Sequence, residues 1–261
     1  MRTFAQVDVF STTPYRGNPV AVVLDGDGLD TDQMQRFANW TNLSETTFVL
    51  PPSDPGADYR VRIFTPAEEL PFAGHPTIGT AHAWLEAHPE HTRDTVVQEC
   101  GAGLVTLRRT GDRLAFAAPP LFRDEPADEE QRAAIAEYLG LDRAAIRDAQ
   151  VLDNGPGFVV VLLDDAKTVL DIVPAQSDLK VGVVGPYPDG APHAIEVRGF
   201  FGANRTTVED PVTGSLNAVV ALWLLRTGRI EAPYVAHQGT VLGRDGEVHV
   251  AQDPDGTVWI G

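Results

Sequence analysis

Residues 69–77 read E-L-P-F-A-G-H-P-T, and residues 209–217 read E-D-P-V-T-G-S-L-N. Both stretches place Glu, Pro and Gly at one spacing, follow the Gly with His or Ser, and continue into an apolar run. The two glycines, Gly74 and Gly214, are 214 − 74 = 140 residues apart. A motif that recurs at a fixed offset predicts that the chain contains two copies of one structural unit.

A second pair of stretches matches at the same offset. Residues 17–25 (G-N-P-V-A-V-V-L-D) align with residues 157–165 (G-F-V-V-V-L-L-D-D). Short apolar strands match easily by chance, but two matches at one offset favour a duplication. We therefore expect two domains related by a pseudo-twofold axis, 1–118 and 119–261, with a cleft between them. The charged, Pro-rich stretch at 119–126 is typical of a linker, and the last strand could return to the first domain.

The fold class follows from the balance of strands and helices. The helices expected at 76–87 and 216–226 are small or apolar on almost every side, so each must be covered all round. Strands outnumber helices in each half, so we expect an α+β fold in which a curved, barrel-like sheet surrounds one central helix per domain. An ordinary α/β layer with one buried helix is the alternative. Alternating or apolar runs predict strands at 3–10, 19–24, 59–65, 95–100, 104–108, 114–117, 158–163, 180–184, 194–200, 234–238, 247–251 and 257–260, and further helices at 32–42 and 129–139.

Composition limits the partners and the compartment. The formal charge is −17, from 37 acidic and 20 basic residues, and such a surface repels nucleic acid and anionic membranes. Cys100 is the only cysteine, so no intrachain disulfide can form, which fits a reducing compartment. The first ten residues lack the apolar block of a signal peptide, and the longest apolar run, 218–225, is too short to span a bilayer. We expect a soluble cytoplasmic protein.

The repeated turns are the best candidates for chemistry. Ser215 is a suitable N-cap, and Pro76 fits a first helical turn. The first turn of a helix offers N–H groups without intrahelical partners, at the positive end of the dipole, and so suits a carboxylate or phosphate. Capping alone is the alternative for either turn taken singly. The sequence contains no complete dinucleotide or phosphate loop, no nucleophile elbow and no histidine spacing that favours a metal, so we expect no cofactor and no metal.

Four stretches together resemble the PhzF-like family, whose namesake is an isomerase of phenazine biosynthesis. They are R-G-N-P-V-A-V (16–22), N-L-S-E-T-T-F (42–48), F-T-P-A-E-E-L-P-F-A-G-H-P-T-I-G-T-A-H-A (64–83) and E-D-P-V-T-G-S (209–215). The family is similar to diaminopimelate epimerase, which has two pseudo-symmetric domains with the active site between them. The resemblance also implies a homodimer.

The resemblance assigns roles to individual residues. Glu45 matches the catalytic acid/base of the family; without the motif it would be read as a surface loop residue. The matching polar residues of the substrate cleft are His75, Asp210 and Ser215, which we expect to act in catalysis, and Asn18. The turns at Gly74 and at Thr213-Gly214 match the backbone that binds the carboxylate of a small metabolite.

A difference from diaminopimelate epimerase narrows the reaction. That enzyme has a cysteine just before the glycine of each repeated turn, whereas this chain has Ala73 and Thr213. The sequence therefore excludes a two-thiol racemisation. A single carboxylate, Glu45, remains to remove a proton and return it elsewhere on the same face, which is an isomerisation. This role requires burial that raises its pKa toward neutrality, with help from a nearby Asp210.

Two alternatives remain open, and one segment departs from the family. Glu45 and Asp210 on opposite faces of a substrate would make a racemase or epimerase, and the fold could also serve a binding protein without activity. The segment 198–208 lacks the proline and glycine pattern expected before the second motif. We expect an exposed loop there, in which Asn204 and Arg205 are candidates for substrate specificity.

Overall fold

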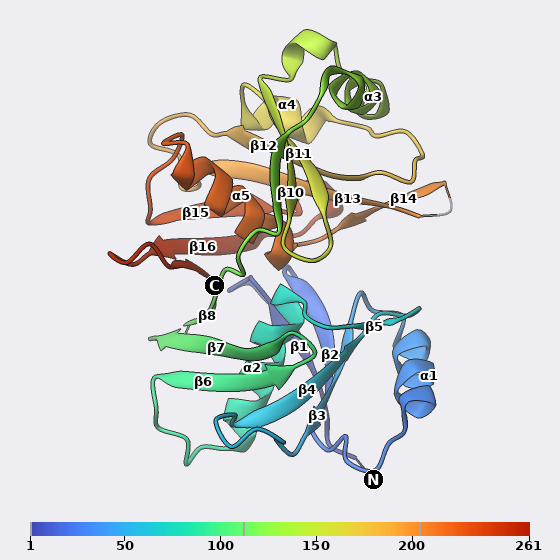
Figure 1. Cartoon of the computed structure of the whole chain (residues 1–261), viewed down its shortest axis with the longest axis vertical. Helices are drawn as coiled ribbons and strands as arrows, with labels where there is room; N and C mark the ends of the chain where they lie inside the picture. Colours follow the sequence, from blue (N-terminus) through green and yellow to red (C-terminus); the bar gives the residue numbers. More distant parts are fainter. Residues whose placement is uncertain (1, 112, 204) are drawn as a thin grey trace. The chain divides into compact units, whose positions relative to one another are not determined.

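The computed structural model describes residues 2–111, 113–203 and 205–261, and it divides the chain into two compact units. The first unit is Met1–Ala117 together with Gly261, and the second is Ala118–Ile260. Figure 1 shows that each unit is a strongly curved sheet with few helices.

The first unit is a curved sheet with one helix against each of its faces. Strand β1 pairs antiparallel with β2, and β2 pairs parallel with β3. Strand β4 pairs antiparallel with β3 and β5 and parallel with β6. Strands β6, β7 and β8 form an antiparallel meander. The elements are β1 (Phe4–Val9), β2 (Asn18–Val23), α1 (Thr31–Thr41), β3 (Thr46–Leu50), β4 (Tyr59–Phe64), β5 (Glu69–Leu70), α2 (Gly74–Ala87), β6 (Thr95–Cys100), β7 (Gly103–Thr110) and β8 (Arg113–Ala117).

The second unit repeats this order of elements and pairings. Strands β10 to β17 pair with the same neighbours and directions as their counterparts in the first unit. Its elements are β10 (Asp148–Asp153), β11 (Phe158–Leu162), α4 (Ala166–Asp171), β12 (Lys180–Pro186), β13 (Ile195–Ala203), β14 (Thr206–Asp210), α5 (Gly214–Arg226), β15 (Tyr234–Gln238), η2 (Thr240–Leu242), β16 (Gly246–Gln252) and β17 (Val258–Ile260). The predicted duplication is therefore confirmed at the level of topology.

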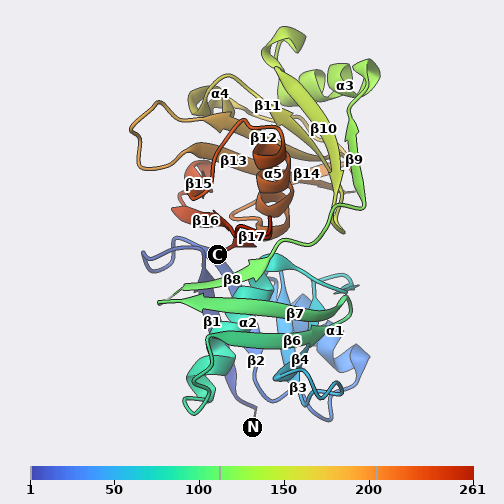
Figure 2. The ribbon, with the colours of Figure 1, turned by 60° about the vertical axis from the view of Figure 1, so that its left-hand side comes forward.

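The central helix of each unit is enclosed by its sheet, as the sequence predicts. Helix α2 contacts strands β1, β2, β3, β6 and β8, and helix α5 contacts β16 and β17. Nine of the thirteen residues of α5 are buried, including Trp223. Figure 2 shows α5 running within the curve of its strands. Among the described strands no pairing closes either sheet on itself, so each unit is an open, barrel-like sheet.

Close packing of α2 on the sheet explains Gly79. A Cβ atom at this position would lie 2.4 Å from Cγ1 of Val20 in β2 and 2.9 Å from Cγ2 of Val9 in β1. Such contacts cannot be relieved without moving the helix away from the sheet. A residue that is unfavourable in a helix interior is therefore placed where the helix approaches the sheet most closely.

The glutamate of each repeated motif has a structural role. Glu69 lies opposite Phe64 in the pairing of β4 with β5, and Glu209 lies opposite Phe200 in the pairing of β13 with β14. In both units an arginine two residues before the phenylalanine forms a two-pronged ion pair with the glutamate. These arginines are Arg62, which also contacts Thr31 at the start of α1, and Arg198, which also contacts the last carbonyls of α4. The pairs fix the strand that leads into each turn.

Several sequence expectations are corrected by the structure. The expected linker at 119–126 contains strand β9 (Arg123–Pro126), which pairs with β10 and precedes α3 (Glu129–Leu139) and η1 (Arg143–Ala145). The segment 198–208 is not an exposed loop, because most of it belongs to the β13–β14 hairpin. Arg205 is exposed, with φ of 57°, while Asn204 lies outside the described residues. The sequence patterns also missed five regular elements: β3, β5, β10, β14 and α4.

Strand β17 belongs to the second unit, and Gly261 alone is grouped with the first. No helix that the structure describes combines the length and the apolar character that a bilayer crossing requires.

Candidate active site

The first unit brings Glu45 and His75 together. Glu45 follows the end of α1 and immediately precedes β3, and its backbone carbonyl accepts a hydrogen bond from the N–H of Ala21 in β2. His75 is the second residue of α2. The Nδ1 atom of His75 lies 3.4 Å from Oε2 of Glu45, and the two side chains are 5 % and 17 % exposed. Glu45 is therefore a largely buried carboxylate rather than a surface loop residue.

The imidazole of His75 is neutral at physiological pH. Burial lowers its pKa to about 3, and a hydrogen bond with the backbone of Pro19 offsets part of this lowering. The Nε2 atom is fully buried, and no atom among the described residues meets hydrogen-bond geometry with it. A neutral imidazole has one donor and one acceptor nitrogen, so it can pass a proton between two partners.

Asn18 lies in the same unit, at the start of β2. It is fully buried and pairs with Val9 across the β1–β2 ladder. The turn before it is held by Asp8, whose Oδ2 accepts hydrogen bonds from the N–H groups of Arg16 and Gly17. A Cβ atom at Gly17 would lie 2.1 Å from the carbonyl oxygen of Val9, so only glycine fits. The local sequence R-G-N-P thus fixes the backbone position of Asn18, from which its side chain extends.

The second unit gathers Asp210, Thr213, Gly214 and Ser215 at the start of α5. Asp210 ends β14, and its Oδ2 accepts a hydrogen bond of 2.6 Å from the Thr213 hydroxyl. Gly214 is the first residue of α5 and is buried. Ser215 is the second helical residue, so the expectation that it is the N-cap is wrong; Thr213 occupies that position.

Both central helices begin without a side-chain cap. Ala73, the N-cap of α2, has no hydrogen-bonding side chain, and the Thr213 hydroxyl is directed to Asp210 instead of to the helix. The first-turn N–H groups of each helix are therefore not satisfied by the N-cap side chain. Gly74 and Gly214 bring no side chain to these starts, and both are buried.

Sequence reasoning missed two residues of the second unit. Gln238 is fully buried, and its amide contacts both ends of the turn between Asp210 and Thr213. Asn154 donates from Nδ2 to the carbonyl oxygen of Ser215 at 3.2 Å. The 140-residue offset could have identified Gln238, because it aligns with Gln98, which is also fully buried and hydrogen-bonded to the central helix of its own unit.

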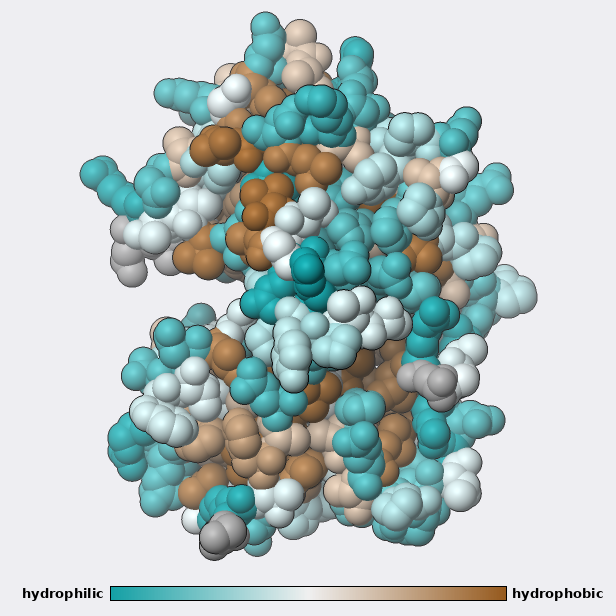
Figure 3. All heavy atoms as spheres, turned by 180° about the vertical axis from the view of Figure 1, so that it is seen from behind, coloured by the Kyte–Doolittle hydropathy of each residue, from teal (hydrophilic) through white to brown (hydrophobic). Residues whose placement is uncertain are grey.

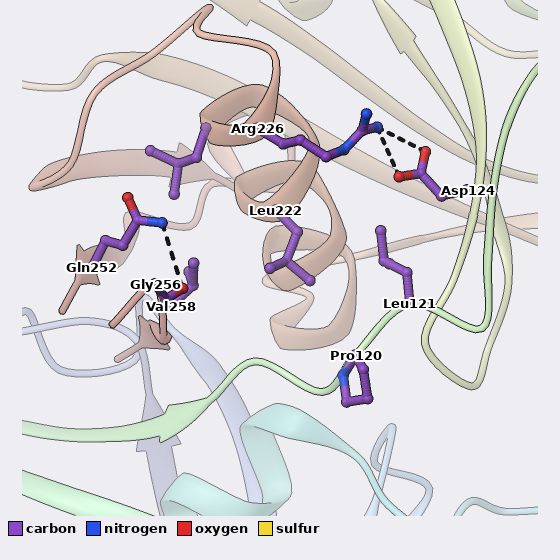
Figure 4. A pocket seen from close by; sticks show the side chains of 9 residues that line it. Pro120, Leu121, Asp124, Leu222, Arg226, Gln252, Gly256 and Val258 are labelled. Atoms are coloured by element: carbon purple, nitrogen blue, oxygen red, sulfur yellow. Dashed lines mark hydrogen bonds and ion pairs between the residues drawn. The ribbon is translucent and has the colours of Figure 1, made fainter. Parts of the chain in front are cut away.

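A pocket of about 330 Å³ in the second unit is separate from these residues. It lies at the far end of α5 (Figure 4), where Leu222, Leu225 and Arg226 meet the segment that carries Leu121 and Asp124. Arg226 forms an ion pair with Asp124 at its rim. None of the predicted site residues lines it, so it does not bear on the chemistry of the repeated turns.

Comparison with known proteins identifies the family. The family model of phenazine biosynthesis-like proteins, PhzC-PhzF, matches residues 7–257. The chain belongs to this family. It is 34 % identical to the trans-2,3-dihydro-3-hydroxyanthranilate isomerase of Pseudomonas fluorescens, over 94 % of this chain and 88 % of the relative. It is 35 % identical to antisense-enhancing sequence 1 of Schizosaccharomyces pombe, over 96 % of this chain and 90 % of the relative.

A solved structure shares the fold across the whole chain. The structure of a predicted epimerase from Pseudomonas aeruginosa superposes with a TM-score of 0.83 and 28 % identity, covering 100 % of this chain and 95 % of that one. The resemblance read from the four sequence motifs is thus confirmed, and so is the diaminopimelate epimerase-like fold class.

Proposed function

We propose that this PhzF-family protein is a cofactor-independent isomerase that moves a proton within a small carboxylate-bearing metabolite. As a member of a family with named isomerases among its relatives, the chain is an isomerase. The observation that carries the finer proposal is the Glu45–His75 pair, in which a largely buried carboxylate lies 3.4 Å from a neutral imidazole. Such a pair can take up a proton and deliver it elsewhere.

In this mechanism Glu45 is the catalytic base and then the catalytic acid. Its carboxylate removes a proton from a substrate carbon and returns it at another carbon on the same face. His75 stays neutral and either donates a hydrogen bond to the substrate or relays the proton, because a neutral imidazole has one donor and one acceptor nitrogen. Asn18, Asp210 and Ser215 are proposed to contact the substrate.

The substrate carboxylate is proposed to bind the N-terminal turns at Gly74 and Thr213-Gly214. Their helix starts are free of side-chain caps, and the positive end of a helix dipole favours an anion. This local attraction is needed because the chain carries a net charge of −17. We further propose a cytoplasmic homodimer without nucleic-acid or membrane partners.

The test uses trans-2,3-dihydro-3-hydroxyanthranilate, the substrate named for the Pseudomonas relative. Its conversion is followed by proton NMR with the wild type, Glu45→Gln and the control Glu86→Gln. Glu86 forms a matched pair with His82 at 3.5 Å, in the same unit but exposed. The proposal expects turnover by the wild type and by Glu86→Gln, and a rate about 10²–10⁴-fold lower for Glu45→Gln. Equal rates for all three proteins would refute the role of Glu45.

An epimerase is the second candidate. It is favoured by Asp210, a second carboxylate held by a neighbouring hydroxyl, and by the predicted epimerase among the structural relatives. Chiral analysis of a panel of amino acids incubated with the protein separates the two reactions. Unchanged enantiomeric ratios together with conversion of trans-2,3-dihydro-3-hydroxyanthranilate would favour the isomerase. Changed ratios that disappear in both Glu45→Gln and Asp210→Asn would favour the epimerase.

A further inference from the structure

Gln238 occupies the centre of the second unit's turn. It is fully buried at the end of β15, and all of its amide positions are used. Its Oε1 accepts from the N–H of Thr213 at 3.0 Å and from Nδ2 of Asn217 at 2.8 Å. Its Nε2 donates to the backbone oxygen of Asp210 at 3.1 Å and to Oγ1 of Thr213 at 3.0 Å. One side chain therefore holds the turn at both ends.

The orientation of this amide follows from its partners. The Thr213 N–H and the Asn217 amide can only donate to it, since the Asn217 atom involved is a nitrogen, so the atom that they meet must be the oxygen. The Nε2 group then faces Asp210 and Thr213. Because Gln238 donates to the Thr213 hydroxyl oxygen, the proton of that hydroxyl is free to point to Oδ2 of Asp210, at 2.6 Å. The donor and the acceptor of each hydrogen bond from Gln238 through Thr213 to Asp210 are therefore fixed.

We propose that Gln238 is the positioning residue for Asp210: it aims the Thr213 hydroxyl at the Asp210 carboxylate and so fixes which carboxylate oxygen faces the reaction. With Oδ2 engaged by Thr213, any proton that Asp210 carries sits on Oδ1. This inference rests on the proposed function, because it assumes that Asp210 acts on the substrate. It adds a residue that touches no substrate but decides how Asp210 is presented.

The first unit offers a matched control. Gln98 aligns with Gln238 at the offset 238 − 98 = 140 and is equally buried. Its Nε2 donates to the Thr77 hydroxyl at 3.0 Å, and its Oε1 accepts from the Tyr59 hydroxyl at 3.0 Å. Thr77 aligns with Asn217 at the same offset. Gln98 thus anchors the central helix of its own unit, and these two hydrogen-bond partners are hydroxyl groups, not carboxylates.

The first measurement needs no substrate. The carboxyl carbon of Asp210 is observed by carbon-13 NMR at neutral pH, and its signal is assigned with Asp210→Asn. In Gln238→Met, which preserves size but removes all four hydrogen bonds, the Asp210 signal is expected to shift because the hydroxyl loses its fixed direction. Gln98→Met should leave the signal in place. An unchanged Asp210 signal in folded Gln238→Met overturns the proposal.

The second measurement separates positioning from mere stability. With trans-2,3-dihydro-3-hydroxyanthranilate, Gln238→Met is expected to lower kcat by up to about 10²-fold, the cost of a misplaced group, and to change KM much less. Gln98→Met should retain kcat. Gln238→Glu, which is isosteric but draws the hydroxyl proton to itself, should also lower kcat, and it keeps the test decisive if the methionine variant is unfolded. Equal kcat losses in Gln98→Met and Gln238→Met would contradict the proposal. A wild type that fails to turn over this substrate counts against the proposed function with this compound, whereas the Asp210 signal tests the role of Gln238 without any substrate.

Discussion

At the scale of single residues, the candidate site depends on two largely buried groups, a carboxylate and an imidazole. Glu45 is a carboxylate removed from most solvent contact, and His75 is an imidazole held neutral by burial. A cationic histidine here would form a static ion pair with Glu45 and compete with proton transfer. In the proposed mechanism, the neutral imidazole leaves Glu45 as the group that gains and loses a proton.

The buried histidine predicts a specific acid sensitivity. Because the pKa of His75 is about 3 in the folded protein and about 6.5 in the unfolded chain, the unfolded state binds more protons between these values. The stability that comes from burying neutral His75 is therefore fully present above about pH 6.5. As the pH falls below this value, the free energy of unfolding decreases by up to about 1.4 kcal/mol per pH unit. Urea unfolding at about pH 7 and about pH 5 measures this slope.

The control for this prediction is a histidine on the same helix. His75→Gln should flatten the pH dependence of the free energy of unfolding, whereas His82→Gln should leave it as in the wild type because His82 is exposed. If both variants keep the wild-type slope, the pKa of His75 is not lowered by folding, and the prediction is wrong.

Much of the site at this scale could be predicted from the motifs, and the missing part has a physical cause. The motifs brought attention to Glu45 and His75, but nothing in N-L-S-E-T-T-F indicates that the glutamate is largely buried beside the histidine. Asn154 was missed because a single amide in a loop carries no pattern, and the sequence signal for Gln238 is limited to its match with Gln98 at the 140-residue offset. Its role appears only when the strand is placed beside the turn that it supports.

At the scale of elements, the arginine–glutamate pairs explain why the repeated motif starts with glutamate. Arg198 and Glu209 are 3 % and 11 % exposed, while Arg62 and Glu69 are 24 % and 38 % exposed. The two pairs share geometry but differ in solvent access. They therefore allow the cost of breaking a buried and a partly exposed pair to be compared within one protein.

Arg198→Met should destabilise the fold far more than Arg62→Met. Removing Arg198 leaves Glu209 buried without its partner and the last carbonyls of α4 without a donor, which costs about 3–5 kcal/mol. Loss of the more exposed Arg62 pair should cost only about 0–1 kcal/mol. The free energy of unfolding in urea gives both values.

A double variant provides the check on this reasoning. Arg198→Met with Glu209→Gln removes the unpaired buried charge and should recover part of the lost stability. If the double variant is no more stable than Arg198→Met, or if the two single arginine variants lose equal stability, the burial argument is wrong.

Elements were predicted well where periodicity was strong and poorly where strands are short or polar. The pattern located β6, β15 and α3 at their observed bounds. Strands β9 and β14 were missed because their sequences, R-D-E-P and T-T-V-E-D, are charged or polar, and only tertiary pairing with β10 and β13 makes them strands. The duplication offers a remedy for β3, β10 and α4, because their counterparts in the other unit, β12, β1 and α1, were predicted.

At the scale of the whole chain, the excess of acidic residues sets the response to salt. Figure 3 shows hydrophilic side chains spread widely over the face in view. With a net charge of −17, repulsion among surface carboxylates opposes folding more than the exposed ion pairs support it. Screening should therefore stabilise the protein.

The melting temperature is expected to rise by a few degrees when sodium chloride is raised from about 0.02 M to about 0.5 M, since the Debye length falls well below 10 Å. Scanning calorimetry at constant pH measures the change. A melting temperature that falls with salt would show that ion pairs outweigh the net repulsion.

The most direct test of the account is the transfer of solvent deuterium to carbon. In D₂O, wild-type protein should place deuterium on a carbon of trans-2,3-dihydro-3-hydroxyanthranilate or its product, as detected by mass spectrometry and proton NMR. Glu45→Gln should lose this incorporation by about 10²–10⁴-fold, while Glu86→Gln retains it. Equal deuterium incorporation by the wild type and Glu45→Gln would contradict the claim that the Glu45 carboxylate carries the proton.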